Sequence, residues 1–355
     1  MANANPSYPM QLAGQASQFG NAIKRWDSMA RWVFQTENHF VNYARTQIVD
    51  GGDRWYRRVH GAVDTIKHEP ASFISGDGQA FNMQREIRPD EEELISMEVI
   101  DQINEDIIDY PYQSQQFLNR IRSVMRVVDS RVARMVLRGA RTAAQQNGKF
   151  PGGSRAQVGA DTAGGGGGFA ATRDAIRTAI PRNINGATLL VNAIDELAEK
   201  LTNNSIPEAM RVLWVPPYIR SVMSLHDGFV KTTYKAPAGN NFVEREILRF
   251  RGFTIMEVPE EAEGGLGVGT GVFPNKNYTD VARSGRDYNV DARGVVGIAM
   301  AEPSAVEAIF YGGMIRSQPP IYDPNRRAWM FGAATHMGCD PIMWEGCGEL
   351  FVNLV

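Results

Sequence analysis

The chain has 355 residues, of which 43% are hydrophobic and 22% charged, a balance typical of a globular protein with two or three folding units. Its 37 basic and 40 acidic side chains give a net charge of −3, which excludes a histone-like or polybasic nucleic-acid binder. No apolar run approaches 18 residues, so the sequence predicts no membrane span. The two cysteines, Cys339 and Cys347, exclude a disulfide framework, and we expect reduced thiols in a cytosolic chain.

The first 90 residues predict an arm and an extended loop rather than a folded core. Residues 1–20 are polar, lack the features of a secretion signal and predict a flexible arm. Residues 21–50 carry aromatic and apolar side chains at helical spacing, which predicts a short amphipathic helix. Residues 53–90 combine Gly, Pro and mixed charges with irregularly spaced apolar residues. We expect a long two-stranded excursion that packs on another surface.

A sharp change of charge follows this excursion. Residues 86–109 contain ten acids and one base, whereas residues 110–155 contain nine bases and one acid. Such blocks are commonly solvated faces of the fold. Their adjacency also suits ion pairing between neighbouring copies of the chain.

The basic block contains the clearest helix, which we expect at about residues 112–147. Its apolar residues, including Phe117, Ile121 and Val128, lie on one face, and only Gly139 interrupts it as a weak helix former. The opposite face contains most of the arginines: Arg120, Arg126, Arg131, Arg134, Arg138 and Arg141. This arginine face is either solvated or turned toward a polyanion.

The second half predicts alternating helices and strands. Residues 148–169 contain nine glycines without the GxxxxGK[ST] pattern of a phosphate loop, so they predict a flexible loop rather than a nucleotide site. Helices are expected at residues 189–201 and 218–226, and a long Gly-rich loop at 259–294. Strands are expected at 211–215, 253–258, 294–301, 305–312, 326–337 and 350–355. The inventory indicates an α+β fold.

The sequence contains no pattern of residues typical of catalysis or metal binding. Its five histidines have no metal-ligand spacing, and no nucleophile elbow, kinase motif set or zinc-deaminase signature is present. The acidic run 90–93 lacks the glycine-punctuated spacing of a calcium loop. We therefore expect neither an enzyme nor a cofactor.

The order of these elements resembles the major capsid proteins of bacteriophages with the Hong Kong 97-type fold, in particular those of short-tailed phages. Five passages carry the resemblance, which covers nearly the whole chain after residue 20. They are the excursion 53–90, the helix ending in VLRGAR at Arg141, the segment from LLVNAIDELAEK to VLWVPPYIRSVMS, the segment FRGFTIMEVPE, and the closing run from DPNRRAWMFG to GELFVN. The closing turn, Gly338 to Pro341, departs from the family's usual Gly-x-x-Arg-Pro-Glu.

The resemblance implies a division of the chain into four regions. They are an N-terminal arm at 1–52, an extended loop at 53–95, a peripheral domain at 96–185 and 303–335 with a long spine helix, and an axial domain at 186–302 and 336–355. The implied function is a head protein that assembles as pentamers and hexamers into an icosahedral shell around double-stranded DNA. The alternatives are an encapsulin-type cellular nanocompartment and, more remotely, a nucleotide-binding enzyme.

The resemblance also implies partners and contact residues. The partners are further copies of the chain, a separate scaffolding protein, a portal protein, non-specifically bound DNA and a decoration or cement protein, in a virion assembled in the host cytoplasm. The arginine face would line the interior against DNA. Candidate contacts between subunits are Lys67, Phe73, Phe81, Glu91, Glu92 and Glu93. Some relatives form a Lys–Asn isopeptide cross-link, but most lack it, and we do not expect one between Lys67 and Asn353.

Overall fold

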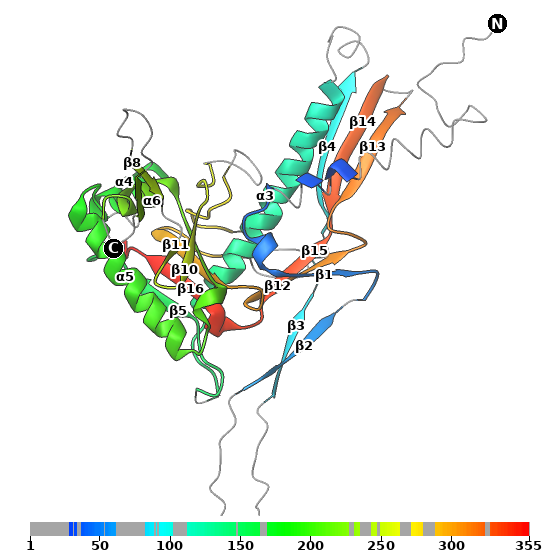
Figure 1. Cartoon of the computed structure of the whole chain (residues 1–355). Helices are drawn as coiled ribbons and strands as arrows, with labels where there is room; N and C mark the ends of the chain where they lie inside the picture. The colour runs from blue at the N-terminus through cyan, green and yellow to red at the C-terminus, as the bar shows by residue number, and fades with distance from the viewer. Residues whose placement is uncertain are drawn as a thin grey trace, which may run out of the picture.

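The structure is a computed structural model, and its helices and sheets are mixed along the chain (Figure 1), which confirms the α+β class expected from the sequence. The residues that it describes are 28–30, 32–33, 37–52, 54–61, 82–88, 90, 92–101, 112–146, 148–163, 169–226, 231–234, 243–246, 249–262, 271–279, 288–323 and 327–354. Helices and strands from both halves of the chain surround one long central helix.

That central helix is α3, Tyr112–Ala140, which confirms the predicted spine helix except that it ends before residue 147. Its apolar face is fully buried, as the 3.6-residue spacing predicts. Gly139 is needed for packing: a Cβ at this position would lie 2.6 Å from Sγ of Cys347. The residue that weakens the helix in isolation therefore lets it approach strand β16, Cys347–Phe351.

A six-stranded sheet packs against α3, and its strand order is β5-β16-β11-β6-β10-β9. The further bounds are Ser154–Gln157 for β5, Val295–Ala301 for β11, Arg211–Val215 for β6, Phe253–Glu257 for β10 and Arg249–Phe250 for β9. In β6, Val212 and Trp214 join the core around α3, whereas Leu213 and Val215 join a second core on the other face. The strand is buried on both faces, which explains its continuous apolar sequence.

Helices cover the second face of this sheet. The helices are α4 at Phe169–Ala179, α5 at Ile184–Asn203 and α6 at Pro217–Met223, with a short 3-10 turn, η3, at Glu208–Met210. The Asn183 side chain caps α5 by accepting a hydrogen bond from Gly186 N at 2.9 Å. Pro217 begins α6, where its missing N–H costs no helical hydrogen bond. The two predicted helices in this region are thereby confirmed, with small shifts at their ends.

Two three-stranded sheets lie beside α3. One has the order β13-β14-β4 and the other β1-β12-β15. The first contains Arg316–Asp323 (β13), Ala328–Thr335 (β14) and Leu94–Asp101 (β4). The second contains Arg45–Val49 (β1), Val306–Tyr311 (β12) and Met337–Pro341 (β15), with 3-10 turns at Val41–Tyr43 (η2) and Trp344–Gly346 (η4). These sheets therefore join segments from both ends of the chain.

Two hairpins complete the described structure. Strands β2, Trp55–His60, and β3, Asn82–Ile87, pair antiparallel and extend away from the sheet of β1, β12 and β15 (Figure 1). They confirm the two-stranded excursion expected at residues 53–90. The second hairpin pairs β7, Lys231–Tyr234, with β8, Val243–Glu246.

Several elements differ from the sequence-based expectation. The Gly-rich segment 148–169 contains β5, which forms because it pairs in parallel with β16, nearly 200 residues away. Residues 21–50 contain helical positions at 28–30 and 32–33, as predicted, but also strand β1. The acidic segment contains β4, and α4 follows the glycines of the loop without having been anticipated. In β1, β4 and β5 a distant partner strand determines the element.

Candidate assembly surfaces and the polar clusters of the spine helix

Two arginines of the predicted exposed face are buried inside the subunit. The exposed fraction is 3% for Arg131 and 0% for Arg134. The expectation that these two residues face packaged DNA is therefore wrong for this conformation of the chain. Its physical reason is that chain segments around Asp90 and Tyr288 pack over this part of α3 and supply acceptors for both guanidinium groups.

Arg131 belongs to a buried ion pair. Its Nη1 lies 2.7 Å from Oδ2 of Asp90, and its guanidinium lies 4.6 Å from the ring centroid of Tyr288. The Tyr288 hydroxyl donates to the same carboxylate at 2.9 Å. The backbone carbonyl of Asp90 also contacts Nε2 of His336. The cluster joins α3, the start of the β4 segment, the loop before β11 and the link between β14 and β15, so it fixes four parts of the chain together.

Arg134 lies beside a second buried cluster. Its guanidinium lies 4.6 Å from the ring of Tyr278, whose hydroxyl donates to Oε2 of Glu261 at 2.6 Å. Burial raises the pKa of Tyr278 well above its usual value, and the neighbouring Glu261 carboxylate adds to the effect. Lys276 balances that carboxylate at 3.2 Å. The phenol therefore acts as a neutral hydrogen-bond donor in the interior.

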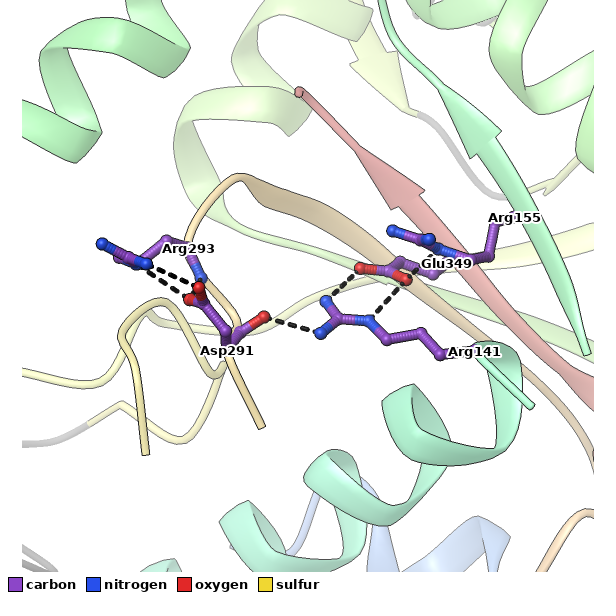
Figure 2. A network of polar contacts seen from close by, with 5 residues as sticks. All are labelled: Arg141, Arg155, Asp291, Arg293 and Glu349. Atoms are coloured by element: carbon purple, nitrogen blue, oxygen red, sulfur yellow. Dashed lines mark hydrogen bonds and ion pairs between the residues drawn. The ribbon is translucent and has the colours of Figure 1, made fainter. Parts of the chain in front are cut away.

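A third cluster, drawn in Figure 2, lies at the end of α3. Glu349 of β16 is fully buried and receives Nε and Nη2 of Arg141 at 2.9 and 2.5 Å and Nε of Arg155 at 2.7 Å. Arg141 also donates from Nη1 to the Asp291 carbonyl at 2.7 Å. Arg293 donates three hydrogen bonds to the Asp291 carboxylate, from its backbone N at 3.1 Å and from Nε and Nη2 at 2.9 and 2.7 Å. Those hydrogen bonds hold the pKa of Asp291 below its ordinary value of 3.8.

This Glu349 cluster connects the spine helix to the six-stranded sheet. Arg141 follows α3 directly, Arg155 lies in edge strand β5, and Asp291 precedes β11. Sequence reasoning selected Arg141 but missed Glu349, because an acid in an otherwise apolar closing strand has no local partner. Its isolation among apolar residues was the only signal, since an acid in a buried strand requires a cation.

The remaining members of the arginine face are less buried. Arg138 is exposed, and the Arg120 side chain is 36% exposed and pairs with Glu98 of β4 at 3.0 Å. The acidic and basic blocks are therefore partly paired within one chain, through Glu98 and Asp90. Arg126 is half-buried, and burial lowers its pKa, with repulsion from Arg122 in the same direction.

The predicted subunit-contact residues fall into two groups. Four of them lie outside the described residues: Lys67, Phe73, Phe81 and Glu91. The cross-link considered between Lys67 and Asn353 is therefore not tested. Asn353 donates to Oδ1 of Asp161 at 3.0 Å. Glu92 and Glu93 are exposed at the start of the β4 segment, and Glu93 lies 3.6 Å from Arg316 of β13. The intersubunit role of these residues stays a prediction.

The hairpin β2–β3 is attached by two arginines. Arg57 makes a bidentate pair, both bonds 2.9 Å, with Glu307 of β12, a carboxylate that is 1% exposed. Arg85 inserts beside η4, where its guanidinium lies 3.6 Å from the Trp344 ring and donates to the carbonyls of Pro341 and Ile342. Burial lowers the pKa of Arg85. The base of the hairpin is firmly held, although its strands extend beyond the body of the subunit.

One sheet face leaves apolar side chains exposed. Ile95, Met97 and Val99 alternate along β4 and are 52%, 45% and 47% exposed, whereas Ile100 points into the core around α3. Ile321 of β13, 51% exposed, is in register with Met330 of β14, which in turn is paired with Val99. We call Ile95, Met97, Val99 and Ile321 the apolar row. A run of exposed apolar residues of this kind marks an interaction surface.

Two classes of site are absent from the part of the chain that the structure describes. No three His, Cys, Asp or Glu side chains there are grouped as metal ligands. No helix in the same residues is long and apolar enough to cross a membrane.

Comparison with known proteins completes the description of the fold. No protein-family model and no curated protein matches this sequence. Among solved structures, the capsid of cyanophage P-SCSP1u matches with a TM-score of 0.69 at 18% identity, over 90% of this chain and 89% of that one. The mature capsid of bacteriophage PhiM1 matches with a TM-score of 0.63 at 13% identity, over 90% and 88%. The chain has the Hong Kong 97-type capsid fold.

The same fold extends beyond these two phages. The capsid of a native GTA particle matches with a TM-score of 0.52 at 11% identity, over 88% of this chain and 89% of that one. In each case the match covers most of both chains. The Hong Kong 97-type fold that the order of sequence elements suggested is therefore confirmed as the fold of this chain.

Proposed function

We propose that this chain is the major capsid protein of a bacteriophage, which assembles as pentamers and hexamers into an icosahedral shell around double-stranded DNA. The observation that carries the proposal is the match to two phage capsids over about nine-tenths of the chain. Those matches come from assembled shells, which supports self-association. The low identities mean that the resemblance lies in the fold, so the function requires support from the surfaces of the chain as well.

The surfaces left open by one subunit support this proposal. The hairpin β2–β3 extends from the body, and the apolar row leaves four large side chains exposed on a neighbouring sheet. Single exposed apolar residues are ordinary, but aligned ones gain burial only when a partner covers them. A subunit that tiles a closed shell meets neighbours on several sides and uses such surfaces.

We further propose that the regions correspond to those expected from the sequence. Residues 1–52 form the arm, 53–95 the extended loop, 96–185 and 303–335 the peripheral domain, and 186–302 with 336–355 the axial domain. One hydrophobic core joins α5 and α6 to one face of the six-stranded sheet, which supports an axial domain, whereas the core around α3 contains residues of both proposed domains.

The proposal extends to the partners of a phage head. We infer a separate scaffolding protein, a portal protein and a decoration or cement protein, in a virion assembled in the host cytoplasm. We also infer that the chain is not an enzyme, in keeping with the absence of catalytic motifs from its sequence.

The proposed DNA contact narrows to the arginines that remain accessible on α3. Arg120 and Arg138 are 18 residues apart, which places them on the same side of the helix at 100° per residue. Arg141 is partly accessible, with 28% of its side chain exposed, but its Nε, Nη1 and Nη2 atoms all bond to Glu349 or the Asp291 carbonyl. Arg120 bonds to Glu98 through Nε only, among the described residues. We infer a non-specific electrostatic contact through Arg138 and Arg120. Unchanged genome retention at all salt concentrations in an Arg120→Gln, Arg138→Gln variant would remove this contact.

The experiment that tests the function is electron microscopy of the purified protein, alone and with the product of the adjacent open reading frame as candidate scaffold. We expect closed shells of uniform diameter with fivefold and sixfold capsomers. A monodisperse monomer or small ring in both preparations would contradict the proposal. Shells loaded with a protein cargo and empty of DNA when isolated from cells would indicate the nanocompartment alternative.

A further inference from the structure

A cavity beside α3 is lined by Arg126, an arginine that forms no ion pair or hydrogen bond with the described residues. Its volume is about 350 Å³, and it is lined by Glu37, Asn38, His39, Arg122, Met125, Arg126, Asp129 and Val272. The helix residues in this set lie on the side of α3 next to the arginine face, under the segment that leads to η2. The cavity therefore lies between the spine helix and the N-terminal part of the chain, away from the Glu349 cluster.

The cavity is lined by two carboxylates and two guanidinium groups, and three of these four groups have direct hydrogen-bond partners. Arg122 makes a bidentate pair with Glu37, with both bonds at 2.7 Å. The buried Asp129 carboxylate accepts backbone N–H bonds from His39, Phe40 and Val41 at 2.9, 2.7 and 2.9 Å. Both carboxylates of the lining are thus already engaged.

Arg126 is the exception. Among the residues that the structure describes, it makes no ion pair, hydrogen bond or ring contact. It is half-buried, and burial together with the neighbouring Arg122 lowers its pKa. A guanidinium that has lost part of its hydration without gaining an acceptor favours binding of an anion, most directly a planar carboxylate or a phosphate.

The shape and charge of the cavity favour a carboxylate side chain over DNA. A guanidinium can hold a carboxylate through two parallel hydrogen bonds. Met125 and Val272 line the cavity beside Arg126, and such apolar walls suit the methylene stem of an acidic residue. A cavity of about 350 Å³ has room for one side chain, whereas DNA would approach as an extended charged surface.

The chain itself carries carboxylates that could fill this site in another copy. The block at residues 86–109 has a surplus of nine acids over bases. In the described part of the block, Glu86, Asp90, Glu93 and Glu98 form ion pairs within the subunit, whereas Glu92 is exposed and forms no ion pair with the described residues. An exposed carboxylate on one copy and a guanidinium without an ion pair in a cavity on another are complementary.

We propose that the cavity at Arg126 is a socket that receives an acidic side chain from a second copy of this chain. The proposal rests on the proposed function, because it names one contact by which subunits of the shell recognise each other. Such a contact contributes more to the specificity of subunit association than to its affinity. A neighbour in the wrong position would leave both charges unpaired.

The test uses the Arg126→Lys variant and carbodiimide coupling, which joins an amine to a carboxylate only where the two are in contact. The protein is a mixture of isotopically heavy and light full-length chains, examined by mass spectrometry at the highest association state that it reaches. We expect an amide between the amine introduced at position 126 of one copy and an Asp or Glu of the other. Coupling only to Glu37 of the same copy, or no coupling at all, would overturn the proposal.

A second measurement separates this socket from the function of the whole chain. Arg126→Glu and Arg126→Met are compared with Arg182→Glu, a charge reversal at an exposed position outside α3 and its cavity, in nuclease-treated preparations without DNA. We expect at least a tenfold loss of shell yield for Arg126→Glu, a smaller loss for Arg126→Met and little change for Arg182→Glu. All unassembled variants should keep the thermal midpoint of the parent chain.

The outcomes distinguish the proposals. Normal shells from both Arg126 variants would overturn the socket and leave the capsid function intact. Normal shells with a loss of retained DNA would assign Arg126 to DNA instead, and would also overturn the socket. If the parent chain forms no shells under any condition, the capsid function fails, and the isotope-mixed coupling still decides whether the cavity binds a second copy.

Discussion

The spine helix α3 and strand β4 lie side by side in the structure, and the outer face of β4 points away from α3. The two regions differ in how far one subunit buries or pairs their side chains. Arg131 and Arg134 of α3 are charged, but the subunit surrounds them with a carboxylate, carbonyls and aromatic rings. Met97 and Val99 of β4 are apolar, but the subunit leaves them nearly half exposed. Charge at the surface and apolar residues inside is the usual distribution, and here it is locally reversed.

The buried arginines of α3 therefore make contacts within the subunit, whereas the exposed apolar residues of β4 are available for contacts between subunits. Burying an ion pair costs desolvation energy, and removing one partner leaves the other charge buried and unpaired. The Arg131–Asp90 pair should therefore be needed for the folded subunit. Exposed aligned apolar residues contribute little to one subunit and become buried when another copy covers them. The two regions should therefore respond in opposite ways to substitution.

The largest expected effect is at the buried pair of α3. Arg131→Met would leave the Asp90 carboxylate in the interior without its cation, which we expect to lower the free energy of unfolding by about 3–5 kcal/mol. Urea denaturation of the unassembled subunit measures this change. Arg138→Met is the matched control at an exposed position of the same helix. A loss for Arg131→Met no larger than for its control would show that the cluster does not stabilise the subunit.

The next effect is at the Glu349 cluster. Glu349→Gln removes the charge that accepts from Arg141 and Arg155 and should lower the free energy of unfolding by about 2 kcal/mol. The control is Glu196→Gln, which breaks the exposed pair with Lys200 and should cost less than about 1 kcal/mol. If both substitutions lowered the free energy of unfolding equally, the buried ion pairs of Glu349 would stabilise the subunit no more than an exposed ion pair does.

The apolar row should show the reverse behaviour. Met97→Ser with Val99→Ser should change the free energy of unfolding by only about 0.5 kcal/mol per site, because both side chains are largely exposed. The same variant should lose most of its shells in electron microscopy, because the surface no longer gains apolar burial. Ile184→Ser, at an exposed position of α5, controls for the loss of any exposed apolar residue. Shells in normal yield from the double variant would show that the row is not a contact.

The smallest effect is a pH dependence at Asp291. Its pKa in the folded chain is held below the ordinary 3.8 by the hydrogen bonds from Arg293, so its contribution to stability is complete above about pH 3.8. That contribution is lost as the pH falls through the lower, folded-state pKa. Asp291→Asn should therefore flatten the loss of thermal midpoint below pH 4 and leave the curve at neutral pH nearly parallel to the parent. Arg293→Gln should shift the acid limb to higher pH, and no shift would contradict the assignment.

The sequence alone determined the elements that depend on local patterning. The 3.6-residue spacing of apolar side chains gave α3 and α5, and the continuous apolar run gave β6 as a strand buried on both faces. The ordering of these elements gave the capsid fold. The helix and strand predictions succeed because they depend on the spacing of apolar residues that are close together in the sequence.

Tertiary structure alone decided which charged and apolar residues are used inside the subunit. Arg120, Arg131 and Arg138 lie on nearly the same side of α3, and helical spacing cannot distinguish them. Arg131 is buried because Asp90 and Tyr288 pack over it, and Tyr288 lies more than 150 residues away along the chain. In the same way β5 exists because β16 pairs with it. Partners so distant in sequence leave no local periodicity, so only the folded chain brings them together and determines their role.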